Sequence, residues 1–171
     1  MDYNSNHECW LGFIREKYSK EDLIFYQFAI LWISFNSYLN DKYPKIRGDH
    51  SKVEKFAEEY SDFYNNVKEL TKTYFKWRLQ QFKDTKTNGR AYVMDMQTKN
   101  KKNPTEVPFD GYRNTCSEYF EIIYQIRCNY IHGEKQPLNN DDRKLVEWAF
   151  NSFHIFWKEF LKNERSWIYR N

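Results

Sequence analysis

The chain has very few of the residues that end strands and form tight turns. Five Gly and four Pro occur in 171 residues, whereas a barrel or sandwich of short strands needs a turn about every eight to twelve residues. Aromatic residues make up 20% of the chain, so Phe, Tyr and Trp must supply much of the core. A chain of this length suits one core. We therefore expect one all-α domain over residues 1–171, a bundle of about five to six helices.

The longest apolar run, Leu23–Ser37, predicts a helix at the centre of that bundle. Apolar residues lie all round this helix, which is typical of a buried one. The run is shorter than the about 20 apolar residues that a membrane span needs, so we expect no membrane contact. The helix should continue to about Leu39. Ser34 and Asn36 should have polar partners, because buried polar groups need them.

Periodicity and capping signals predict the other helices. A short helix is expected over Cys9–Tyr18 from its apolar spacing. Further helices are expected to begin at side chains that can cap them, namely Ser19, Ser51 with Glu54, Thr115 with Glu118, and Asn139 or Asn140. The segment after Ser51 continues to Phe82, and the pattern leaves open whether it breaks at positions 61–62. The helix after Thr115 should end at Gly133, and the last helix should reach Leu161.

Residues 83–111 lack helical periodicity and predict a polar loop or insertion. Lys, Asn, Thr, Asp, Gly and Pro dominate this segment, which has a single apolar patch at Ala91–Met96. A structureless stretch of this length in a compact domain is typically functional or disordered. It contains a cationic cluster that includes Lys99, Lys101 and Lys102. Either the cluster is a solvated loop, as charge runs usually are, or it is an arm that contacts RNA phosphates.

Charge and cysteine content say less about function than the helical pattern says about the fold. The chain has 27 Lys plus Arg against 24 Asp plus Glu, a net charge of +3, which permits RNA or DNA binding without predicting it. Three Cys without a Cys-x-x-Cys pair, and a start without a secretory pattern, predict a reducing cytoplasm. The four His do not have the spacing of metal ligands, so we expect no metal and no other cofactor.

An Arg and a His lie five residues apart where the helix after Thr115 is expected to end. On an ideal helix that step turns about 140°, which would separate Arg127 from His132. Because helix ends fray and Gly133 allows the chain to leave the helical path, the two side chains can converge. An imidazole can move protons near neutral pH, and a guanidinium can stabilise charge on a phosphate in the transition state. This pair predicts phosphodiester cleavage that requires no metal.

Residues Arg127–Gly133, reading Arg-Cys-Asn-Tyr-Ile-His-Gly, resemble the Arg-x4-6-His signature of HEPN domains. The segment Trp32–Leu39 is similar to the earlier core helix of prokaryotic members. The resemblance implies an α-helical, metal-independent endoribonuclease that dimerises so that two motifs face one cleft. It also implies a toxin or antiviral effector, with an antitoxin or another defence protein as a partner. Arg127 and His132 would be catalytic. Asn129 would be the accompanying polar residue, because Cys128 occupies the position after Arg that is often polar in the family.

A second interpretation gives the same residues a structural role. Arg127 can pair with an acid, and His132 can interact with the carbonyl groups at the helix end; the candidate acids are Glu121, Glu134 and Asp141. The protein would then be a non-catalytic helical module that binds a nucleotide, a nucleic acid or a protein. Cys128 is expected to be a small core residue. Asn36 is expected near Arg127 or His132, because the motif is the richest source of polar partners.

Overall fold

The computed structural model describes residues 23–82, 92–95, 105–108, 115–131 and 140–168. The elements in these ranges, in chain order, are α2 (Ile24–Lys42), α3 (Asp49–Glu59), α4 (Ser61–Phe82), β1 (Tyr92–Asp95), β2 (Thr105–Pro108), α5 (Cys116–Ile131) and α6 (Asn140–Ile168). The described residues are therefore mainly helical, and the predicted all-α bundle is confirmed. The helix expected over Cys9–Tyr18 and the cap expected at Ser19 lie outside the described residues.

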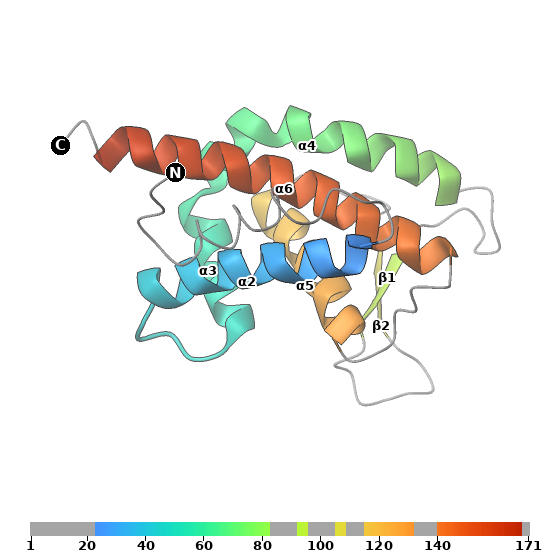
Figure 1. Cartoon of the computed structure of the whole chain (residues 1–171), viewed down its shortest axis with the longest axis horizontal. Coiled ribbons are helices and arrows are strands. Elements are labelled where there is room, and N and C mark those ends of the chain that lie inside the picture. Colours follow the sequence, from blue (N-terminus) through green and yellow to red (C-terminus); the bar gives the residue numbers. More distant parts are fainter. Residues whose placement is uncertain (1–22, 83–91, 96–104, 109–114, 132–139, 169–171) are drawn as a thin grey trace.

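Helix α6 organises the bundle. It lies between α4 and α2 in Figure 1 and packs against both, while α3 packs against α5. The last helix extends seven residues beyond the predicted end at Leu161, to Ile168. Helices α3 and α4 are separate, because the chain turns at Tyr60, which answers the question that the sequence left open.

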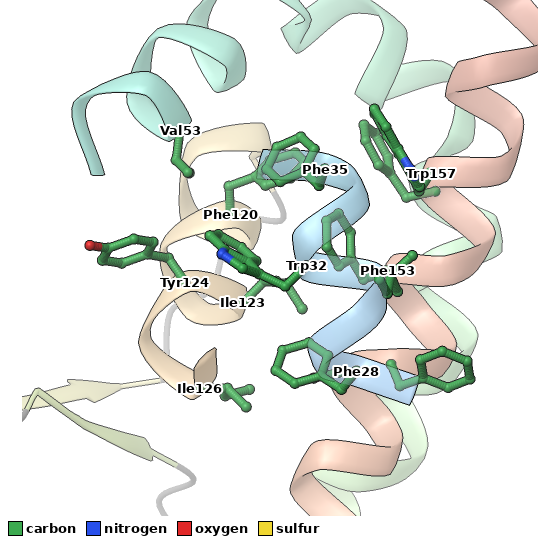
Figure 2. Close-up of a cluster of buried hydrophobic side chains, with 14 of the residues drawn as sticks. Phe28, Trp32, Phe35, Val53, Phe120, Ile123, Tyr124, Ile126, Phe153 and Trp157 are labelled. Atoms are coloured by element: carbon green, nitrogen blue, oxygen red, sulfur yellow. The ribbon is translucent and has the colours of Figure 1, made fainter. Parts of the chain in front are cut away.

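Aromatic side chains from four helices form the core around Phe35 of α2. The Phe35 ring stacks on Phe120 at 5.4 Å between ring centroids and meets Phe56, Phe153 and Trp157 edge-on at 5.0–5.3 Å. Figure 2 shows most of these rings between α2, α5 and α6. Edge-on and offset pairs of this kind are the arrangements that aromatic rings prefer. The expectation that aromatic residues supply the core is confirmed.

Helix α2 is buried on most sides but not all round. Ser34 has the partner that the sequence required, since the Trp157 indole donates a hydrogen bond to its hydroxyl oxygen over 3.0 Å. Tyr26 and Ile33 are exposed, and seven residues separate them, so they lie on one face of the helix. None of the described helices has the length and apolar content of a membrane span.

The capping box predicted for α5 is present, but the one predicted for α3 is not. At α5, the Glu118 N–H donates to the Thr115 hydroxyl over 3.3 Å, and the Thr115 N–H donates to the Glu118 carboxylate over 3.4 Å, which confirms this capping box. The capping box predicted at Ser51 is wrong, because α3 begins at Asp49. Gly48 precedes it with φ of 85°, a conformation open to Gly, so the cap position lies three residues before Ser51.

Part of the predicted polar loop is a β-hairpin. Strands β1 and β2 pair antiparallel, with Tyr92 opposite Pro108 and Val93 opposite Val107. The hairpin lies beside α5, which β1 contacts (Figure 1). The expectation of a structureless segment is therefore wrong for these eight residues, because a pairing between two short strands leaves no helical periodicity in either of them.

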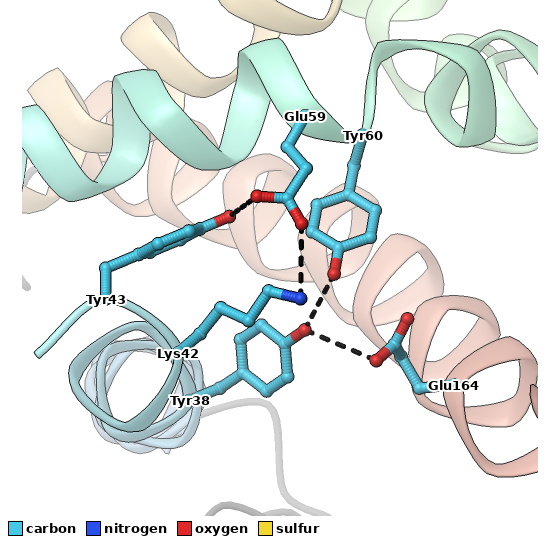
Figure 3. A network of polar contacts seen from close by, with 6 residues as sticks. All are labelled: Tyr38, Lys42, Tyr43, Glu59, Tyr60 and Glu164. Atoms are coloured by element: carbon cyan, nitrogen blue, oxygen red, sulfur yellow. Dashed lines mark hydrogen bonds and ion pairs between the residues drawn. The ribbon is translucent and has the colours of Figure 1, made fainter. Parts of the chain in front are cut away.

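A network of polar side chains joins the end of α2 to α3 and α6 (Figure 3). The Tyr38 hydroxyl lies 3.1 Å from the Tyr60 hydroxyl, and Tyr43 donates to Glu59 over 2.9 Å. The Lys42 ammonium lies 3.1 Å from the same carboxylate. Burial alone would raise the pKa of Glu59, but the Tyr43 hydroxyl and the Lys42 ammonium lower it below its ordinary value. The network therefore favours the charged form of Glu59 in the folded protein.

We expect Glu59→Gln to weaken the fold at neutral pH but not in acid. The lowered pKa means that the stabilising effect is complete above the ordinary pKa of 4.5 and is lost as the pH falls through the lower pKa of the folded protein. Because the side chain is partly exposed, the loss should be at most about 1 kcal/mol. Urea unfolding from pH 7 to pH 3 measures it. Glu58→Gln is the control, since Glu58 pairs only with exposed Lys55 among the interactions described. An equal loss at pH 3 would contradict the linkage.

Candidate functional site

Arg127 lies near the end of α5 between two aromatic rings. Its guanidinium carbon is 5.3 Å from the centroid of the Trp32 ring on α2 and 5.9 Å from that of Tyr124, one turn earlier on α5. The side chain is 19% exposed. Aromatic faces attract a cation, and more strongly when water is partly excluded. The two rings therefore hold the guanidinium in place at the edge of the core.

The acid that pairs with Arg127 comes from α3. Nη2 of Arg127 lies 3.3 Å from Oδ2 of Asp49, in the first turn of that helix. The predicted partner Glu121 instead contacts His50, and the side chains of Glu134 and Asp141 lie outside the described residues. The contact is longer than the 2.7–2.9 Å typical of charge-assisted hydrogen bonds, and it uses one of the five donors of a guanidinium. Asp49 thus holds Arg127 by a single weak contact.

Three buried polar atoms, one of Arg127 and two of helix α2, have no hydrogen-bond partner within the described part of the chain. They are Nε of Arg127, Nε1 of Trp32 and Oδ1 of Asn36. In Figure 2 the indole nitrogen of Trp32 points from α2 toward the Tyr124 side of α5. A buried donor without a partner costs about 1–3 kcal/mol, and such groups in native proteins often mark functional positions. The site therefore has N–H donors that its own side chains do not satisfy.

The proximity of Asn36 to Arg127 or His132 remains a prediction. Asn36 follows Trp32 by four residues, one turn along the same helix, and the Trp32 ring contacts Arg127. The structure gives no hydrogen bond between Asn36 and Arg127, however, and Oδ1 of Asn36 is among the unsatisfied atoms. Asn36 thus lies on the helix that carries the site, but it does not satisfy Arg127.

Asn129 faces the core. Its side chain accepts a hydrogen bond from Gln125 over 2.9 Å, and the residue is 1% exposed. Two residues turn a helix by about 200°, so Asn129 lies almost opposite Arg127 on α5. A direct contact of Asn129 with a ligand of Arg127 has no support in this geometry, and its role as the accompanying polar residue remains a prediction.

A histidine that the sequence did not single out lies in the same region. Nε2 of His50, on α3, is 2.8 Å from Oε2 of Glu121, and its ring centroid is 4.8 Å from that of Tyr124. Nδ1 lies 3.8 Å from Glu54, beyond hydrogen-bond distance. His50 and Arg127 thus contact the same tyrosine. The sequence did contain a signal for a polar face on this helix: Glu121, Tyr124 and Arg127 recur every three residues and so lie along one side of it.

The other predicted site residues lie outside the described residues. These are His132, which directly follows the last residue of α5, and the cationic cluster Lys99, Lys101 and Lys102. The structure therefore does not place His132 relative to Arg127.

The two described cysteines are buried. Cys116 and Cys128 are free and buried, and burial raises the pKa of the Cys116 thiol to about 12. A thiol with a raised pKa is a poor nucleophile, because the thiolate is the reactive form. Within the described residues no group of three or more His, Cys, Asp or Glu side chains could hold a metal ion. The ionisable side chains that the structure brings together in this region are Arg127 with Asp49 and His50 with Glu121.

The fold and this site define a helical bundle with an aromatic-lined guanidinium at the junction of α2, α3 and α5. No protein-family model matches the chain, and comparisons with curated proteins and with solved structures give no significant match. Function is therefore inferred from the side chains around Arg127.

Proposed function

We propose that the protein is a metal-independent endoribonuclease of the HEPN type. The observation that carries the proposal is the state of Arg127: among the described residues, its oriented and partly exposed guanidinium has one weak ion pair, a weak contact with the Cys128 sulfur and an Nε–H without a partner. Planar guanidinium groups bind phosphate oxygens through two parallel N–H donors. The motif histidine, His132, follows α5 directly. Arg127 would bind the scissile phosphate, and His132 would move protons.

In this reaction the ribose 2′-hydroxyl attacks the adjacent phosphorus. His132 accepts the hydroxyl proton or donates a proton to the 5′ oxygen that leaves, and Arg127 stabilises the negative charge on the phosphorane. The products are a 2′,3′-cyclic phosphate and a 5′-hydroxyl. The test is incubation of the purified protein with single-stranded RNA in excess EDTA. We expect RNA to be cut and DNA of the same sequence to survive, because DNA lacks the 2′-hydroxyl.

Asp49 would compete with a phosphate for Arg127. We therefore expect Asp49→Asn to tighten the binding of a 2′-O-methyl RNA oligonucleotide, which cannot react, by about fivefold. The aromatic rings of Trp32 and Tyr124 still orient the guanidinium in this variant. Fluorescence anisotropy at fixed salt measures the dissociation constant. Weaker binding would show instead that Asp49 positions Arg127.

The matched control for this measurement is Asp62→Asn. Asp62 is an exposed acid in the first turn of α4, as Asp49 is in the first turn of α3. Both variants remove one negative charge, so the control corrects for the general attraction of RNA to a more positive protein. An equal change in both variants would remove the argument for competition at Arg127.

The proposal includes a homodimer with the motifs of both subunits in one cleft. Exposed apolar side chains near the motif support it, since Ile131 is 53% exposed at the end of α5 and Tyr26 is exposed on α2. A two-fold axis would bring the same patch from each subunit together. We expect light scattering to report a dimer, and Ile131→Glu to give a monomer. Leu70→Glu on α4, also 53% exposed, should stay dimeric.

We also propose the biological class that the HEPN resemblance implies, a cytoplasmic toxin or antiviral effector with an antitoxin or defence protein as a partner. Expression of the wild-type chain should arrest cell growth, and His132→Ala should relieve the arrest. The alternative, a non-catalytic binding module, is favoured by the ion pair between Arg127 and Asp49, because it gives Arg127 a structural role. Equal toxicity of both chains, with no RNA cleavage in vitro, would favour that module.

A further inference from the structure

Cleavage of RNA by its own 2′-hydroxyl involves two proton transfers. One group takes the proton of the attacking hydroxyl, and a second group gives a proton to the 5′ oxygen as it leaves. The motif supplies a single histidine, His132, in each subunit. A second acid–base group is therefore required, either from a partner subunit or from elsewhere in this chain.

His50 has the surroundings of such a group. Its Nε2 is held by the carboxylate of Glu121 at 2.8 Å, and its side chain is 40% exposed. A carboxylate bound to one nitrogen of a histidine fixes the orientation of the ring. The other nitrogen, Nδ1, makes no hydrogen bond with the described residues, since Glu54 is 3.8 Å away. Nδ1 is therefore the atom that can exchange a proton with a bound substrate.

The position of His50 connects it with Arg127. The His50 ring and the Arg127 guanidinium both contact Tyr124, and Asp49, the neighbour of His50 in sequence, pairs with Arg127. The charged groups around His50 are Glu54 on its own helix, Glu121 on α5, and the pair of Asp49 with Arg127. A substrate bound at Arg127 in place of Asp49 would therefore have to extend along Tyr124 to reach the imidazole.

We propose that His50 is the general acid of this site, an inference that rests on the proposed ribonuclease function. As the bond between the 2′ oxygen and phosphorus forms, His132 takes the hydroxyl proton. As the bond between phosphorus and the 5′ oxygen breaks, Nδ1 of His50 gives its proton to that oxygen. Glu121 is a positioning residue, because it acts on the substrate only through the His50 ring.

A substrate with a good leaving group separates this role from a structural one. Uridine 3′-(p-nitrophenyl phosphate) releases p-nitrophenolate, which needs no protonation to leave. We expect His50→Gln to slow cleavage of single-stranded RNA in EDTA by about 10²- to 10⁴-fold, the usual effect of an acid–base group. The same variant should cleave the p-nitrophenyl ester at close to the wild-type rate.

Two further variants test the pair of His50 with Glu121. Glu121→Gln should slow RNA cleavage less than His50→Gln does and should also leave the ester reaction near the wild-type rate. Glu58→Gln, which neutralises an exposed carboxylate on the same helix as His50, should cleave both substrates like the wild type. Melting curves of each variant show whether it is folded.

The outcomes separate this inference from the proposed function. If the wild type cuts RNA and His50→Gln cuts it equally well, His50 is not the acid and only this inference is overturned. The same holds if a folded His50→Gln protein loses both reactions to the same extent, because a general acid is not needed for the ester. If the wild type cuts neither substrate, the ribonuclease function is wrong and the role of His50 is rejected with it.

Discussion

His132→Ala should slow the cleavage of single-stranded RNA by about 10²- to 10⁴-fold, the contribution that a positioned acid–base group usually makes. The rate is measured in excess EDTA with purified protein, because the proposed roles require a proton carrier and a fixed cation but no metal-bound water. The variant should fold normally, since a residue that follows a helix end carries little packing. Circular dichroism of wild type and variant checks this.

The controls for His132→Ala replace residues outside the proposed chemistry. His7→Ala removes a histidine far from the motif in sequence and should leave the rate unchanged. Cys128→Ala should also remain active, because the buried thiol meets Arg127 only through a weak contact of 3.8 Å between Nη1 and Sγ. Cleavage that persists in folded His132→Ala protein would reject the mechanism. So would cleavage that stops in EDTA and returns when a divalent ion is added.

Arg127→Ala should be about as damaging as His132→Ala, because it removes the cation that stabilises the phosphorane. Arg127→Lys should not restore the full rate, since an ammonium cannot make the planar two-donor contact with phosphate oxygens. In the Arg127→Ala protein Asp49 loses its partner, but its side chain is 35% exposed, so water can solvate it. Single-turnover rates with saturating RNA separate a loss in chemistry from a loss in binding.

A structural role for Arg127 predicts a different pattern. The Arg127→Ala protein would then melt at a lower temperature, because the guanidinium joins α5 to Asp49 on α3 and to the Trp32 ring on α2. Arg127→Lys would recover much of that stability, since the ammonium keeps the charge. A full catalytic rate in Arg127→Lys protein would therefore contradict the proposed contact with phosphate.

Much of the fold followed from local sequence patterns. The lack of turn residues and the aromatic content predicted a helical bundle, and the spacing of Thr115 and Glu118 predicted the start of α5 correctly. The start of α3 was predicted wrongly, because Ser51 has the right neighbours for a cap but Gly48 already turns the chain into the helix. Capping rules describe which side chains can cap a helix end. The backbone conformation determines at which of these residues the helix begins.

The candidate site could be predicted only in outline. The sequence singled out Arg127 from its place at a helix end, and the structure places its guanidinium against Trp32 and Tyr124. The acid that pairs with it could not be found among its near neighbours, since Asp49 lies 78 positions earlier in the chain. A role for His50 could not be predicted from the sequence, because no metal-ligand pattern surrounds it and its partner Glu121 is 71 positions away.

The sequence by itself determined the helical class of this protein, the aromatic nature of its core and the position of an Arg near the end of α5, because these depend on composition and on spacings within one helix. Only the tertiary structure decided that the first turn of α3 meets α5. That meeting pairs Asp49 with Arg127 and His50 with Glu121, and in the part of the chain that the structure describes Nε1 of Trp32 and Nε of Arg127 have no hydrogen-bond partner. Contacts between distant segments depend on how helix faces fit together, and many sequences with the same periodicity would bring different polar residues together at such a junction.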